Sequence, residues 1–238
     1  YGFEPGGPVD RGEVQRFYDS VSSQLDASPY RDHALFLNYG YLPGEAPSFS
    51  PVDLPAQLPG RNPIRLVCEL VGAYPLRDTD RVLDVGCGRG GTIAVLRRYF
   101  RVGEVTGLDL SPVAVAFCQQ RHGDANTRFL QGDAHRLPFP DGSFDVVTNV
   151  ESSHCYGELP PFFAEVARVL RPGGAFLYTD VLANDRLEEA LAALEAEGLH
   201  IEHQRDITAN VLLSCDETAR MNARAFQAGN DETMLERF

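Results

Sequence analysis

A regular alternation of short apolar runs with helical stretches, beginning near residue 64, is the feature of this chain that most limits its possible folds. Runs typical of strands lie at 81–85, 104–109, 127–131, 144–150 and 175–181. Between them lie segments typical of helices, one of which begins at Ser111-Pro112 with a serine cap and a proline in the first turn. Strands that alternate with helices favour right-handed crossovers and a parallel sheet. The sequence therefore predicts an α/β fold with a doubly wound, mostly parallel, Rossmann-like sheet and helices on both faces, in which ligands bind at the carboxyl ends of the strands.

The first 63 residues have a different pattern and predict a separate N-terminal region. Residues 1–10 have the glycine and proline content of a linker, and residues 11–28 carry apolar side chains at helical spacing. From Pro43 to Pro63 a proline recurs at every fourth position, which excludes both a continuous helix and a central strand. A loop of this length is usually either a functional lid or a disordered segment. We therefore divide the chain into residues 1–63, a linker with a helical cap and a lid loop, and residues 64–238, the ligand-binding core.

The charge and cysteine content argue against several classes of function. Arginine supplies all 21 basic side chains, whereas Asp and Glu supply 34, so the net charge is −13. Such a chain repels nucleic acids and anionic membranes, and the absence of lysine removes Schiff-base and Walker-type chemistry. The five cysteines include no C-x-x-C pair, which argues against a disulfide framework and a zinc site. Because there is also no signal peptide and no apolar run of roughly 18 residues, we expect a cytoplasmic protein without a bound metal.

A glycine-rich loop links the first predicted strand to a helix, with the sequence Asp84-Val85-Gly86-Cys87-Gly88-Arg89-Gly90-Gly91. Glycines allow positive φ angles and let a ligand approach the backbone closely. The spacing Gly86-x-Gly88-x-x-Gly91 also fits the dinucleotide fingerprint. An NAD-dependent oxidoreductase and a turn that binds no ligand are therefore both open alternatives on the loop alone.

Two carboxylates at the ends of the next predicted strands narrow this choice. Asp109, followed by Leu110, ends the second strand, where a carboxylate can accept both hydroxyl groups of a ribose. Asp133, followed by Ala134, ends the third strand, and the dinucleotide fingerprint does not require a carboxylate there. The amino group of an adenine is a hydrogen-bond donor, and the Asp133 carboxylate could accept its hydrogen bond. The pattern therefore favours an adenosine-containing ligand and argues against NAD.

Four motifs in order, Val82–Gly90, Gly107–Asp109, Gly132–Ala134 and Leu170–Gly174, resemble those of class I S-adenosylmethionine-dependent methyltransferases over roughly residues 78–182. The resemblance implies S-adenosylmethionine as the cofactor and methyl transfer as the activity. It places the methionine part of the cofactor at Asp84, Gly86 and Gly88, the ribose at Asp109 and Leu110, the adenine at Asp133 and Ala134, and the sulfur near Asn149 and Val150. A sulfonium cation suits a site that has carboxylates and no lysine.

The segment after the fourth predicted strand carries the residues that we expect to act on the methyl acceptor. His154 is the candidate general base, because an aliphatic hydroxyl is a poor nucleophile until its proton is accepted. Asp180 ends the fifth predicted strand, which lies near the fourth in such a fold, so it can orient His154. Glu151 competes for the same role.

Three segments resemble a narrower group, the small-molecule O-methyltransferases of bacterial secondary metabolism, which act on polyketide chains, polyketide-derived lipids or their sugars. The segments are Phe17-Tyr18-Asp19, Leu37-Asn38-Tyr39-Gly40-Tyr41 and Glu151-Ser152-Ser153-His154. The resemblance implies a helical cap that adds Tyr18 and Tyr39 to the cofactor contacts, although Asn38 stands where relatives often have histidine. It also implies a hydroxyl acceptor, either a free small molecule or an intermediate bound to an acyl carrier.

The C-terminal part departs from the full fold of this family, which ends in an antiparallel pair of strands. Residues 199–207 can form one of them, a helix is expected at 215–227, and no apolar run remains for the other strand. Together with the absent initiator methionine, this favours a domain cut from a larger synthase. Two further alternatives keep the cofactor: an N- or C-methyltransferase, and a methyltransferase-like fold that binds the cofactor without transferring methyl.

Overall fold

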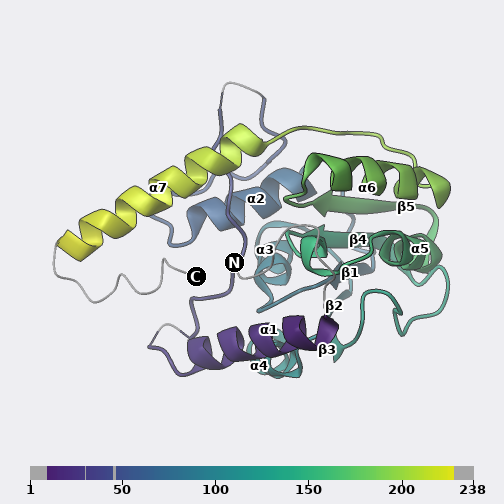
Figure 1. Ribbon diagram of the computed structural model, residues 1–238, viewed down its shortest axis with the longest axis horizontal. Coiled ribbons are helices and arrows are strands. Elements are labelled where there is room, and N and C mark those ends of the chain that lie inside the picture. Colours follow the sequence, from purple (N-terminus) through teal and green to yellow (C-terminus); the bar gives the residue numbers. More distant parts are fainter. Residues whose placement is uncertain (1–9, 30, 45–46, 228–238) are drawn as a thin grey trace.

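In the computed structural model, residues 10–29, 31–44 and 47–227 are described, and a five-stranded sheet lies at their centre (Figure 1). The strands are β1 (Val82–Val85), β2 (Val105–Asp109), β3 (Thr127–Gln131), β4 (Phe144–Val150) and β5 (Leu170–Thr179). Their order is β3-β2-β1-β4-β5, and each neighbouring pair is parallel. The predicted doubly wound α/β fold is confirmed, and its strand order reverses between β1 and β4, where such sheets bind ligands.

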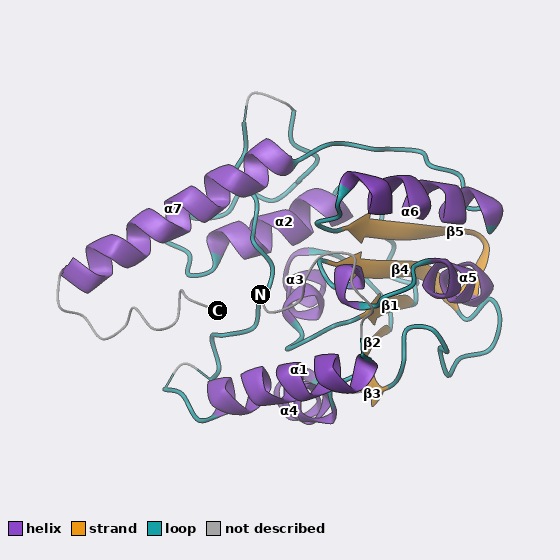
Figure 2. Ribbon diagram, in the orientation of Figure 1, coloured by secondary structure: helices purple, strands orange, loops and turns teal. Residues whose placement is uncertain are grey.

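Helices cover both faces of the sheet (Figure 2). They are α1 (Arg11–Asp26), α2 (Arg61–Val71), α3 (Gly91–Tyr99), α4 (Pro112–His122), α5 (Pro160–Val169), α6 (Asn184–Ala196) and α7 (Thr208–Gln227), with a short 3-10 turn at Ser153–Cys155. Because successive strand residues point to opposite faces, Val82 and Val146 pack against α2, α3 and α4, whereas Leu83 and Val147 pack against α5 and α6. The central strands are thus buried on both faces, which explains their unbroken apolar runs.

The structure differs from the predicted boundaries in β5 and in the C-terminal part, where the helix predicted at 215–227 is α7 and begins earlier, at Thr208. β5 begins at Leu170 rather than near 175, because Leu170 pairs with Phe144 across a register shift in β4. The strand predicted at 199–207 is wrong: these residues form no strand, and α7 follows them from Thr208, whose backbone N–H donates to the Asp206 carboxylate at 2.8 Å. The first nine residues of the predicted linker lie outside the described residues.

The proline-rich segment before α2 is anchored by a buried carboxylate. Glu69 of α2 is 3% exposed and accepts hydrogen bonds from the Ser48 hydroxyl at 2.5 Å and the Phe49 backbone N–H at 2.8 Å. The Arg205 guanidinium, from the segment before α7, donates to the same carboxylate at 2.7 Å. Leu54 adds an apolar contact with the cluster beneath α2. These contacts fix the segment to the core although it contains no regular secondary structure up to residue 60.

Glu69→Gln should release the proline-rich segment, because an amide nitrogen cannot accept these hydrogen bonds and Arg205 loses its charge partner. We expect the free energy of unfolding, measured by denaturant titration, to fall by about 1–3 kcal/mol. Hydrogen exchange at residues 48–52 should become faster. The control is Glu188→Gln on the exposed face of α6, which should change stability by less than about 0.5 kcal/mol. Unchanged exchange at residues 48–52 in the Glu69 variant would contradict the anchoring role.

Candidate active site

A cavity of about 530 Å³ lies at the carboxyl ends of β1 to β4. The strand ends and the glycine loop line one part of it, and α1 with residues 35–39 lines another. No described residue between 40 and 63 lines it, so the cap, and not the proline-rich loop, covers the strand ends. The candidate residues that line the cavity are Tyr18, Tyr39, Gly86, Gly88, Asp109, Leu110, Asp133, Ala134, Val150, Glu151 and His154. Asp84, Asn149 and Asp180 do not line it.

The glycine loop presents bare backbone to this cavity. Gly86, Gly88 and Gly90 all have positive φ angles. A side chain at Gly86 would collide with the hydroxyls of Ser152 and Tyr156, whereas one at Gly88 would meet open space. Gly86 is therefore required by packing inside the protein, and Gly88 is the position where a ligand can approach the backbone.

Asp109, at the end of β2, is tied to the glycine loop. Its Oδ2 accepts from the Gly88 N–H at 2.7 Å, and its Oδ1 accepts from the Ser111 N–H at 2.9 Å. Burial raises the pKa of Asp109 in spite of these bonds, and the nearby carboxylate of Asp19 on α1 raises it further. A ligand that brings hydroxyl donors or a positive charge would stabilise the ionised form of this group.

Asp133, at the end of β3, is oriented by a histidine. Its Oδ1 accepts from the His135 backbone N–H at 2.9 Å and lies 3.1 Å from the ring Nδ1, while the ring Nε2 lies 2.7 Å from the Glu158 carbonyl. The other oxygen, Oδ2, pairs with Arg11 of α1 at 2.6 Å. His135 also lines the cavity, although the sequence analysis did not identify it as a site residue. Its position two residues after a strand-end carboxylate is the signal that could have found it.

Asp84 and Asn149 are buried in β1 and β4 and do not line the cavity. Asp84 is buried and accepts from the Thr148 hydroxyl at 2.6 Å, and burial raises its pKa to about 7. Asn149 is also buried and donates to the Val85 carbonyl at 2.9 Å and the Ser152 hydroxyl at 2.8 Å. Each keeps one side-chain oxygen without a hydrogen-bond partner among the described residues. Spare acceptors therefore remain at the ends of β1 and β4.

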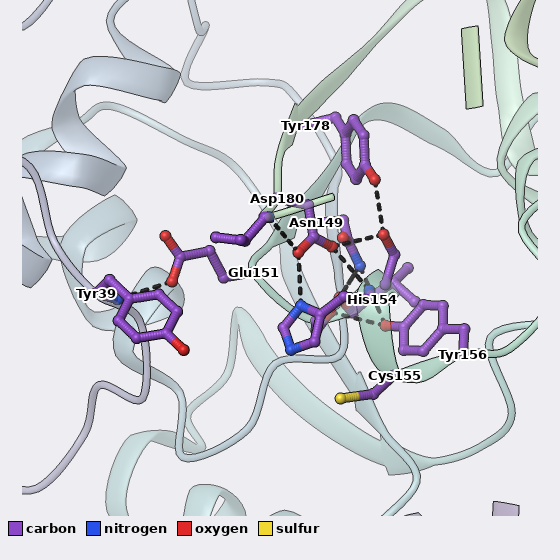
Figure 3. Close-up of polar contacts among 12 residues, drawn as sticks. Tyr39, Asn149, Glu151, His154, Cys155, Tyr156, Tyr178 and Asp180 are labelled. Atoms are coloured by element: carbon purple, nitrogen blue, oxygen red, sulfur yellow. Dashed lines mark hydrogen bonds and ion pairs between the residues drawn. The ribbon is translucent and has the colours of Figure 1, made fainter. Parts of the chain in front are cut away.

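His154 and Asp180 form a dyad just beyond the ends of β4 and β5 (Figure 3). Nδ1 of His154 donates to Asp180 Oδ1 at 2.6 Å, and its backbone N–H donates to Oδ2 at 3.1 Å. The Asp180 side chain is 1% exposed and also accepts from the Ser153 hydroxyl at 2.6 Å. Because a carboxylate can only accept, the short bond places a proton on Nδ1 and leaves Nε2 as the nitrogen that can take up another.

These contacts also set the charge of His154. Burial alone lowers its pKa, whereas the hydrogen bonds to Asp180 and Cys155 raise it, and the net pKa is about 10. With only protein groups around it, His154 is therefore an imidazolium at neutral pH. The structure brings Asp180 and His154 into contact, and the orienting role of Asp180 stays a prediction.

Glu151, the rival candidate, makes a different contact. Its φ angle is 46°, a strained conformation for a residue other than glycine. Its carboxylate accepts from the Tyr39 backbone N–H at 2.7 Å, so it ties residues 35–39 to the end of β4 (Figure 3). Burial raises the pKa of Glu151 to about 7. A cation in the cavity would therefore favour its ionised form.

The cavity as a whole suits a positively charged organic ligand. The cationic side chains that line it, Arg11, Arg89 and His154, each pair with a carboxylate, whereas Asp109 and Glu151 line it without an ion pair among the described residues. The Tyr18 hydroxyl on α1, which also lines the cavity, lies 3.5 Å from the Cys155 sulfur. Within the described ranges, no group of three or more His, Cys, Asp or Glu side chains could hold a metal ion. None of the described helices is long and apolar enough to cross a membrane.

The pKa of His154 gives a direct test of the dyad. In the wild-type protein the His154 ring should stay protonated between pH 6 and 8, because its pKa is about 10. Asp180→Asn removes the carboxylate that holds the imidazolium and should bring the pKa down toward its ordinary value of about 6.5. The measurement is an NMR titration of the histidine ring protons. Ser153→Ala, which keeps the carboxylate, should shift the pKa much less. A wild-type His154 that titrates near its ordinary value would refute the assigned contact.

Comparison with known proteins gives this geometry a family context. Residues 83–178 match the family described as a methyltransferase domain. The chain is 44% identical over 183 residues to the fatty-acid O-methyltransferase of Mycolicibacterium smegmatis, a match that covers 76% of this chain and 65% of that protein. It is 47% identical over 132 residues to phthiotriol/phenolphthiotriol dimycocerosates methyltransferase 1 of Mycobacterium ulcerans, which covers 56% and 49%. The chain thus spans about half to two thirds of the length of these curated relatives.

Two solved structures have the same fold over most of the chain. Geranyl diphosphate C-methyltransferase from Streptomyces coelicolor A3(2), crystallised with S-adenosyl-L-homocysteine, matches with a TM-score of 0.68 and 20% identity over 89% of this chain and 87% of that one. The cyclase SpnF matches with a TM-score of 0.70 and 24% identity over 87% and 79%. The two solved structures show the shared fold, and the matched family together with the ordered strand-end motifs identifies residues 83–178 as a class I methyltransferase domain, whose cofactor is S-adenosylmethionine.

Proposed function

We propose that this protein transfers a methyl group from S-adenosylmethionine to a hydroxyl oxygen of an apolar lipid or polyketide-type acceptor. The His154–Asp180 dyad carries the proposal, because the neutral form of its imidazole is a proton acceptor at the wall of the cavity. The similarity to a protein named as a fatty-acid O-methyltransferase supports oxygen as the atom methylated. The acceptor is either free or bound to an acyl carrier, and both forms should be assayed.

The residues around the cavity fit the cofactor. Asp109 would accept the ribose hydroxyls and Asp133 the adenine amino group, while the bare backbone at Gly88 leaves room for the methionine part. The cofactor supplies an electrophilic methyl group on a sulfonium centre. Val150 and His154 would then lie at the methyl end of the cavity.

The dyad would remove the acceptor proton during transfer. His154 accepts the hydroxyl proton on Nε2, while Asp180 holds the Nδ1–H and stabilises the resulting imidazolium. His154 loses its resting proton more easily when a second cation occupies the cavity, because like charges disfavour its imidazolium. The net charge of the cavity is the same before and after transfer, since His154 gains the positive charge that the methyl donor loses. The surrounding carboxylates therefore stabilise both states.

His154→Ala should lower the rate of methyl transfer to a hydroxyl acceptor by about 10²- to 10⁴-fold, the usual contribution of a general base. The affinity for S-adenosyl-L-homocysteine, measured by calorimetry, should stay close to that of the wild type. His200→Ala, at an exposed position outside the cavity, is the matched control and should retain the full rate. A His154 variant that transfers methyl at the wild-type rate would remove His154 as the base.

A carboxylate acceptor is a second candidate, favoured by the raised pKa of His154. An imidazolium attracts a carboxylate, and a carboxylate oxygen needs no base to become nucleophilic. The relative named as a fatty-acid O-methyltransferase is consistent with such an acceptor. Two other functions are supported only by the overall fold of the two solved structures. Methyl transfer to carbon is the activity in the name of one of them, and the other is named as a cyclase.

The pH dependence separates the two acceptor classes. With a long-chain alcohol, the rate should rise with pH from about 7 toward the pKa of His154, because only the neutral ring accepts a proton. With the matching fatty acid, the rate should fall over the same range, because the imidazolium that binds the carboxylate is lost. Both pH profiles are measured as initial rates of methyl transfer at saturating cofactor. The control is the methyl ester of the same acid. It has neither a hydroxyl group nor a free carboxylate and should accept no methyl group. Equal pH profiles for the two acceptors would contradict both roles of His154.

A further inference from the structure

Arg89, in the middle of the glycine loop, lines the cavity, but its side chain is fully buried and has no role in the cofactor contacts or the proton transfer proposed above. A guanidinium carries five donors and a fixed charge, so burying it is costly unless its donors and its charge have partners. Its side chain therefore has a role that the spacing Gly86-x-Gly88-x-x-Gly91, which specifies no residue at position 89, does not indicate. The partners show what that role is.

The guanidinium binds groups that belong to the cap. Nε donates to the Ala34 carbonyl at 2.8 Å, Nη2 to the Arg31 carbonyl at 3.1 Å, and Nη1 to the Ser22 carbonyl at 3.2 Å and the Asp26 carboxylate at 3.0 Å. Ser22 and Asp26 lie in the last turns of α1, and the other two partners lie in the loop that follows it. One side chain of the glycine loop thus joins both the end of α1 and the next segment of the cap.

Aromatic side chains also pack against the glycine loop. The Arg89 guanidinium carbon lies 3.7 Å from the centre of the Phe117 ring of α4, so a cation–π contact covers its flat face. At Gly91 a side chain would collide with the Phe36 ring at 2.5 Å. Phe36 lines the cavity. The loop that contacts the cofactor and the segment that covers it are therefore shaped to each other.

The two ends of α1 are held differently. At its first residue, Arg11 pairs with Asp133, but their side chains are 54% and 32% exposed. An exposed ion pair contributes little to stability. At its last turns, α1 is bound by the buried charge of Arg89, which cannot be released without leaving an unpaired cation in the interior. Of the two ion pairs, only the one at the C-terminal end of the cap helix therefore involves a fully buried charge.

We propose that Arg89 is a positioning residue that couples the cap helix α1 to the glycine loop, so that the cap-side wall of the cavity is held in place over the bound cofactor. That wall includes Phe17, Tyr18 and Val21. The inference rests on the cofactor site of the proposed function, but it is independent of the methyl acceptor and of His154.

The test compares Arg89→Met, which keeps the length and apolar stem, with Arg89→Lys, which keeps the charge. Hydrogen exchange of the full chain is measured with and without S-adenosyl-L-homocysteine, and the affinity for this ligand is measured by calorimetry. In Arg89→Met, amides at residues 20–34 should exchange about tenfold faster, while those of β1 and β4 stay protected. The ligand should bind about tenfold more weakly and should no longer slow exchange in α1. Arg89→Lys should restore part of both effects, and Arg98→Met, at an exposed position on α3, should change neither.

Unchanged exchange at residues 20–34 in Arg89→Met would overturn the proposal, and so would loss of ligand-induced protection in the Arg98 control. If Arg89→Met does not fold, Asp26→Asn replaces it, because it removes the charge partner of Arg89, which Arg89 shares with the exposed Arg31, and leaves the Arg89 side chain in place. Asp26→Asn should speed exchange in α1 and leave β1 unchanged, and equal loosening of both would overturn the proposal. If the wild-type protein does not bind S-adenosyl-L-homocysteine, the proposed function is wrong. The hydrogen-exchange rates measured without ligand still test the role of Arg89 in that case.

Discussion

Parallel pairing of β1 with β2 and β4 is the constraint on which the site depends. The carboxyl ends of parallel strands meet at one edge of the sheet, so Asp84, Asp109 and Glu151 converge although they are far apart in the sequence. The pairing of β5 with β4 then brings Asp180 within hydrogen-bond distance of His154. Because helices bury both faces of the sheet, polar side chains gather at the carboxyl ends of its strands, where the cavity separates them from the cap.

The charges gathered at this edge explain why a cationic methyl donor suits it. Burial raises the pKa values of Asp84, Asp109 and Glu151, which means that their ionised forms lack compensating positive charge. His154 supplies one positive charge, but Asp180 already neutralises it. A bound cation would lower the cost of keeping these carboxyl groups ionised. The same acidic surroundings would stabilise His154 once it has taken the acceptor proton.

Local patterns predicted much of the fold and named several residues that line one cavity, whereas the cofactor contacts of these residues stay predictions. The bounds of β3 and β4 follow directly from their apolar runs, and Asp109 and Asp133 follow from their places at strand ends. The strand expected at 199–207 failed because a strand needs a hydrogen-bonding neighbour, and the described residues provide none for it.

The remaining misses depend on contacts between distant segments. The choice between Asp180 and Glu151 could not be made from the sequence, because it depends on the positive φ of Glu151, which brings its carboxylate to Tyr39. Arg89 and His135 were overlooked for a related reason. The partners of Arg89 come from a cap more than 50 positions earlier in the chain, and His135 acts through the orientation of another side chain.

A crystal structure of the protein with S-adenosyl-L-homocysteine would test most directly whether this cavity holds the methyl donor against His154. We predict that the sulfur lies between Val150 and His154, with the ribose hydroxyls on Asp109 and the adenine amino group on Asp133. A ligand bound outside the cavity, or bound inside it with the sulfur turned away from His154, would contradict the proposed site.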